Sequence, residues 1–153
     1  MAKLDFRARA ARIRELIASE KRPAFDPGEI NELAFPGGLD RQVDRLMAEN
    51  DEAIELAIQF LEADPWFFRS GYIKETFLRR LRYAALTEAQ RARLRDVLLR
   101  IVDSRGGREF REYCKLAKVL QTGELREKLE TRTGSDDETV AQRARSMLAY
   151  LDR

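Results

Sequence analysis

The sequence predicts an all-α fold of stacked antiparallel helical hairpins, forming a single domain over residues 1–153. Three observations predict it. The chain is 44% apolar and 37% charged, a combination that amphipathic helices explain because each has an apolar stripe and a charged back. Apolar residues recur at helical spacing, with no convincing alternation typical of strands. Short turns separate the periodic segments, and no long heptad repeat links them.

In the N-terminal part, the sequence pattern predicts one long helix and an anchored loop. Apolar residues at helical spacing indicate a helix over 3–19. The Pro/Gly-rich segment 21–38 follows, and we expect a short helix over 27–34 within it. Asp26 is the expected cap there, with Pro27 at the first helical position. The apolar anchors of this loop are Phe25, Ile30, Leu33 and Phe35.

Three helices are expected in the middle of the chain. The first two cover 39–49 and 51–63, with Asn50 as the cap between them. A break at Asp64 and Pro65 and a turn near Ser70 and Gly71 precede the third helix, over 71–84. The expected apolar stripe of the 51–63 helix is Ile54, Ala57, Ile58 and Leu61.

Four more helices are expected after residue 87, two of them opened by capping signals. Thr87 and Gln90 have the spacing of a capping box that opens a helix over 88–103, which Gly106 and Gly107 end. A second capping box is expected at 135–138, opening a helix that runs to 151. Between them lie the expected helices 108–121 and 124–132.

The last helix carries a resemblance to a known family. After the acidic turn, Val140 is followed by Ala144, Leu148 and Leu151 at the spacing usual in the second half of a HEAT repeat. The segment 135–151 therefore resembles HEAT/armadillo-like helical repeats, although Ala141 stands where that family commonly has an arginine. The resemblance implies a right-handed α-solenoid that binds proteins or nucleic acids, and it implies no enzymatic activity.

The amino-acid composition limits the catalytic groups and metal ligands that the chain can supply. The chain has no histidine, the commonest general base and metal ligand, so we expect no catalytic centre, no metal and no cofactor. Its one cysteine, Cys114, falls on the apolar side of the 108–121 helix and is expected to be an inert core thiol. A single cysteine fits a reducing compartment, so we expect a cytoplasmic protein. Apolar runs are too short to cross a membrane.

An aromatic and basic stretch at 64–82 could be a core edge or a base-stacking surface. Helical angles place Ile73, Phe77 and Leu81 on one core stripe. Tyr72 and Tyr83 fall on the flank and are the possible exposed aromatics. For the cluster of Trp66, Phe67 and Phe68, core packing is favoured over stacking on bases.

Charge is uneven along the chain. Residues 1–65 have 9 basic and 14 acidic side chains, whereas residues 66–118 have 14 basic and 6 acidic ones. On the 108–121 helix the basic residues share one side, and the neighbouring acids, Glu109 and Glu112, are expected on the flank. We expect the basic residues of the 108–121 helix to form one patch with the arginines of the 71–84 helix. The candidate partner-binding residues are Arg79, Arg82, Arg108, Arg111, Lys115 and Lys118.

These patterns favour a non-catalytic helical-repeat scaffold that binds another protein. The alternative is a nucleic-acid-binding protein that uses the basic patch on the 71–84 and 108–121 helices. Three other interpretations stay open: a merely solvated basic face, a small enzyme built on Asp and Glu alone, and pairing of the acidic 21–65 segment with the basic middle of the same copy or of another copy.

Overall fold

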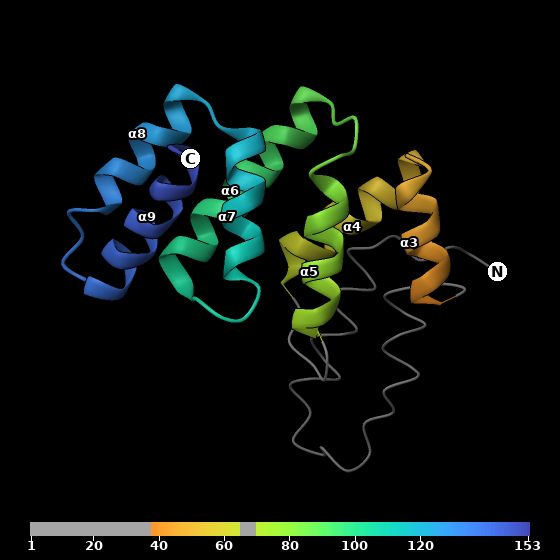
Figure 1. Cartoon of the computed structure of the whole chain (residues 1–153), viewed down its shortest axis with the longest axis horizontal. Helices are drawn as coiled ribbons and strands as arrows, with labels where there is room; N and C mark the ends of the chain where they lie inside the picture. Colours follow the sequence, from red (N-terminus) through yellow and green to blue (C-terminus); the bar gives the residue numbers. More distant parts are fainter. Residues whose placement is uncertain (1–37, 65–69) are drawn as a thin grey trace, which may run out of the picture. The chain divides into compact units, whose positions relative to one another are not determined.

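The computed structural model describes residues 38–64 and 70–153 (Figure 1). Within these ranges the chain forms seven α-helices joined by turns and contains no strand, which confirms the all-α prediction. The predicted helix at 3–19, the loop helix at 27–34 and the cluster of Trp66, Phe67 and Phe68 lie outside the described residues.

The chain divides into two compact units between Arg80 and Leu81, and each is described by itself. The first contains α3 (Leu39–Met47), α4 (Asp51–Ala63) and α5 (Ser70–Leu81), whose last residue belongs to the second unit. The second contains α6 (Glu88–Ser104), α7 (Phe110–Leu120), α8 (Gly123–Arg132) and α9 (Glu138–Leu151). The prediction of a single domain stays a prediction.

In the first unit, α4 begins and ends at polar caps. The Asn50 side chain accepts a hydrogen bond from the Ala53 amide at 3.1 Å, as the sequence predicts. Two acids follow in the first turn, where the helix dipole favours negative charge. Asp64 ends the helix in the left-handed conformation, at φ 46°. The predicted boundaries of α4 are therefore confirmed.

The predicted apolar stripe of α4 is buried at every position. Phe60 of α4 adds an edge-to-face contact with Phe77 of α5, with ring centroids 5.5 Å apart and an interplanar angle of 88°. A charged contact joins the same elements, because the Nζ of the fully buried Lys74 lies 2.6 Å from the Asp64 carboxylate. Packing and an ion pair together fix α5 against α4.

In the second unit, the predicted capping box of α6 is confirmed in both directions. The Gln90 amide donates to the Thr87 hydroxyl at 3.1 Å, and the Thr87 amide donates to the Gln90 side chain at 3.0 Å. Thr122 caps α8 in the same way, accepting from the Leu125 amide at 3.1 Å. Two of the four helices thus begin at a threonine cap.

The predicted capping box before α9 is wrong. The cap is Asp137, whose carboxylate accepts from the amide of Thr139 at 2.9 Å and from its hydroxyl at 2.6 Å. Ser135 instead accepts from the Asp137 amide at 3.2 Å. Glu138 pairs with Arg145 at 2.6 Å and does not fold back to the cap. A nearer carboxylate therefore displaces Ser135 as the cap.

Successive helices of the second unit form two antiparallel hairpins (Figure 1). The guanidinium of Arg91, near the start of α6, donates to the carbonyl of Val119 at the end of α7 at 2.8 Å. In the second hairpin, Arg126 near the start of α8 pairs with Asp152 after the end of α9 at 2.8 Å. In each hairpin, the start of one helix lies at the end of the next.

Equivalent helices of the two hairpins run parallel. Arg132 at the end of α8 donates to both carboxylate oxygens of Asp103 at the end of α6, at 2.7 and 3.0 Å. The ammonium of Lys118 in the last turn of α7 donates to the main-chain carbonyl of Arg153 just beyond α9. The α6/α7 hairpin is therefore repeated by α8/α9 in the same direction.

The core of the second unit lies between these four helices. α6 packs against α7, α8 and α9, and its buried residues include Leu99, which points away from the main stripe. Helix α6 is therefore an inner helix of the second unit. Five apolar residues of α9 are buried: Val140, Ala141, Ala144, Met147 and Leu151. Leu148, which the family spacing places in the core, is partly exposed.

Candidate interaction surface

α7 separates apolar and basic residues onto different sides. Its buried apolar residues are Tyr113, Cys114, Leu116, Ala117 and Leu120, and Phe110 is partly exposed. On the other side, Arg111 and Lys118 are exposed and Lys115 is partly exposed. Positions i, i+4 and i+7 of a helix lie within a narrow arc, so these three residues form one row along α7. We call this set the α7 basic row.

Arg108, the fourth predicted residue of this helix, is exposed in the turn just before α7. The turn follows Gly107, whose φ of 130° is a conformation that L side chains rarely adopt. Helix α7 therefore begins two residues later than predicted, and Arg108 lies in the turn before it.

An acid from the flank of α7 engages Lys115. The Nζ of Lys115 lies 3.2 Å from the carboxylate of Glu112, which is buried, because residues three apart are neighbours on a helix. Lys118 is also engaged, by the Arg153 carbonyl. Among the described residues, no hydrogen bond or ion pair engages the Arg111 side chain, which leaves its guanidinium available to a partner.

The remaining predicted residues lie on α5 and the turn after it. Arg79 is exposed in the first unit and lies 3.6 Å from Glu75. Arg82 places its guanidinium 5.4 Å from the ring centroid of Tyr83, within range of a cation–π contact. Tyr72 and Tyr83 are 57% and 78% exposed, which confirms both as exposed aromatics. The single patch uniting Arg79 and Arg82 with α7 stays a prediction.

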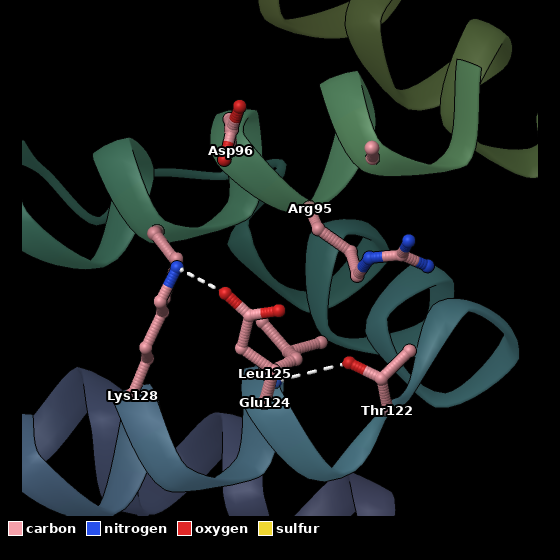
Figure 2. Close-up of a pocket in the computed structure, with 8 residues that line it drawn as sticks. Arg95, Asp96, Thr122, Glu124, Leu125 and Lys128 are labelled. Atoms are coloured by element: carbon pink, nitrogen blue, oxygen red, sulfur yellow. Dashed lines mark hydrogen bonds and ion pairs between the residues drawn. The ribbon is translucent and has the colours of Figure 1, made fainter. Parts of the chain in front are cut away.

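A shallow pocket of about 110 Å³ lies between the parallel helices α6 and α8 (Figure 2). Charges of both signs surround it, and the ammonium of Lys128 bonds the Glu124 carboxylate at 2.8 Å, which lowers the pKa of Glu124. Small-molecule sites usually occupy ~300–1,000 Å³, so this pocket has room for only a few waters. The lining residues are Ala92, Arg95, Asp96, Leu99, Thr122, Glu124, Leu125 and Lys128.

Cys114 lies on the buried side of α7, and burial raises the pKa of its thiol to about 12, with the charge of Arg153 opposing the shift. Because the thiolate is the reactive form, this thiol is unreactive near neutral pH. Among the described residues, no group of three metal-binding side chains gathers in one place. No described helix is both long and apolar enough to cross a bilayer.

Comparisons with known proteins give no relative for this chain: no family model matches it, and neither a curated protein nor a solved structure does. The surface is therefore interpreted from its own geometry.

Several contacts of this surface were not anticipated from the sequence. The engagement of Lys118 by Arg153 joins residues 35 positions apart, which no local pattern can reveal. The contact of Lys115 with Glu112 could have been found, because acid and base at i and i+3 are a known helix pair. Away from this surface, the only sequence feature that could have indicated the burial of Lys74 is Asp64, the acid ten residues earlier with which it pairs.

Proposed function

We propose that this chain is a non-catalytic scaffold that binds another protein, built as a HEAT-like right-handed α-solenoid. The support for the solenoid is the register of the second unit, where two antiparallel hairpins repeat with equivalent helices parallel. Stacked hairpins in one direction are the building plan of helical repeats, whose extended surfaces serve binding. The cytoplasmic location expected from the single cysteine stays a prediction.

The observation that carries the binding proposal is the α7 basic row. α7 packs against α6 and α9, so its backbone is held while Arg111 and Lys118 are exposed. Arginine is enriched at protein interfaces, and a rigid helix presents it at low entropic cost. The pocket between α6 and α8 is too small for a typical ligand, which favours a surface over a cleft.

The exposed Tyr83 supports the same conclusion. Tyrosine and arginine are the residue types most often found at binding hot spots, and here they lie side by side in the turn after α5. A tyrosine stacked by its neighbouring arginine offers a large contact area with few rotatable bonds to order.

Nucleic acid is the second candidate, because exposed cations on a helix can neutralise phosphates. Two features of α7 weaken it. The Glu112 carboxylate beside Lys115 repels phosphate, and Lys118 must leave the Arg153 carbonyl. If Arg108, Arg111 and Lys118 each met one phosphate of a duplex, log–log salt dependence would have a slope of about −0.9 × 3, or roughly −2.7.

Site-specific photo-cross-linking tests the proposal. A photoreactive residue in place of the exposed Val119, next to Lys118, is expected to capture a protein in cells that express the chain. Arg111→Glu should abolish that product, and the control Gln142→Glu should retain it because Gln142 is exposed on α9. Capture of nucleic acid with a salt slope near −2.7 would replace this proposal with the second candidate. Products insensitive to Arg111→Glu would reject a role for α7.

A further inference from the structure

A second charged row lies on α8. Glu124, Glu127 and Glu130 are all exposed. Glu124 bonds Lys128 at 2.8 Å, whereas within the described part of the chain no ion pair or hydrogen bond engages the carboxylates of Glu127 and Glu130. We call these three residues the α8 acidic row.

The two rows match in charge and in length. At 1.5 Å per residue, Arg111 and Lys118 are about 10 Å apart along α7, and Glu124 and Glu130 are about 9 Å apart along α8. The other basic side chains of α8 are already used, since Arg126 bonds Asp152 and Arg132 bonds Asp103. The carboxylates of Glu127 and Glu130 are therefore available to bind basic groups of another molecule.

Within one molecule the two rows lie on separate helices that are fixed in place. α8 packs against α9 and α6, and α7 packs against α6 and α9. Charged contacts at both ends of α8 hold that arrangement. In the part of the chain that the structure describes, no ion pair joins the α7 basic row to the α8 acidic row. Lys115 and Glu124 pair within their own helices, whereas Arg111, Glu127 and Glu130 have no charged partner among the described residues.

We propose that the α7 basic row binds the α8 acidic row of a second copy of this chain, so that copies associate head to tail. The inference rests on the proposed function, because it identifies the protein partner as another copy. A contact between two different surfaces is heterologous, so each copy keeps one free row and association continues beyond the dimer. Exposed charges carry the contact, so rising salt weakens it.

Sedimentation velocity on the full chain, over a range of protein and salt concentrations, tests this association. Wild type is expected to form species larger than a monomer, and raising the salt should dissociate them. Arg111→Glu alone, and Glu127→Lys with Glu130→Lys, should each weaken association by at least about tenfold, because each places like charges opposite one another. Circular dichroism on each variant checks that the helices are retained.

Mixing the variants gives the decisive measurement. An equimolar mixture of the α7 variant and the α8 variant should associate again, because the reversed row of one copy meets the reversed row of the other. Gln142→Glu, a matched control on α9, should behave as wild type. The inference is overturned if wild type stays monomeric to about 1 mM at low salt, the weak end of the affinity scale. It is also overturned if the mixture does not restore association.

The scaffold proposal can be rejected or retained independently of self-association. If the chain stays monomeric while cross-linking at Val119 captures a different protein that Arg111→Glu releases, the partner is not a second copy and the scaffold proposal stands. If cross-linking captures no protein and the chain stays monomeric, both proposals fall.

Discussion

Phe77→Ala is expected to lower the free energy of unfolding by roughly 3–5 kcal/mol, the usual cost of deleting a fully buried phenylalanine. Phe77 is only 1% exposed, so nearly all of its side chain leaves water on folding. Its edge-to-face contact with Phe60 accounts for about 0.5–1.5 kcal/mol of that loss. The remainder is the transfer free energy of the removed atoms and the cost of the cavity.

Urea denaturation followed by far-ultraviolet circular dichroism measures this loss. Phe77→Leu is a graded control that keeps most of the volume and should lose less than the alanine variant. Tyr72→Ala is the exposed control on the same helix and should change stability by no more than about 0.5 kcal/mol. A loss below about 1 kcal/mol for Phe77→Ala, or an equal loss for Tyr72→Ala, would refute the helical phase assigned to α5.

Three further predictions concern two helix caps and the buried thiol. Thr87→Ala should cost about 1 kcal/mol in the same denaturation assay, because it removes an amide acceptor at the start of α6. Asp137→Ala should likewise cost about 1 kcal/mol while Ser135→Ala costs less, and the reverse order would restore the capping box predicted at 135–138. Because burial raises the pKa of Cys114 from 9.0 to about 12, its contribution to stability is complete below pH 9 and is lost as pH rises towards 12. Relative to Cys114→Ala, the free energy of unfolding should fall by about 1.4 kcal/mol per pH unit in that window, and parallel pH profiles would contradict burial of the thiol.

The helices were predictable because their signals are local. Asn50 and Thr87 cap α4 and α6 as expected, since a cap depends on an acceptor and an amide three residues apart. The failure at 135–138 has a local cause too. Three consecutive residues there, 135–137, are of types preferred at an N-cap, and the sequence does not decide between Ser135 and Asp137.

Burial of charged residues was less predictable. The angular positions on α5 place Glu75 on the solvent side, yet Glu75 is buried, and so is Lys74. A helical wheel shows which residues share a face but not what covers that face. A long lysine stem can be covered while its ammonium reaches an acid, and Asp64 fills that role here.

The candidate site shows the same division between local and tertiary information. Four basic residues on or just before α7 are visible in the sequence, but their availability depends on contacts made elsewhere in the chain. Lys118 meets a carbonyl 35 residues away, and Lys115 meets an acid on its own helix. Among the residues that the structure describes, neither an acid nor a carbonyl engages Arg111, although it belongs to the same row.

This difference makes Arg111 the most informative single position on α7. A partner that contacts Arg111 gains a charge-assisted contact without breaking one among the described residues, whereas a partner of Lys115 must compete with Glu112. Charge reversal at Arg111 should therefore change binding while leaving the fold intact. Reversal at Lys115 brings a second carboxylate beside the buried Glu112 and should also cost stability. A loss of binding that appears only together with a loss of stability would show that the row supports the fold rather than a partner.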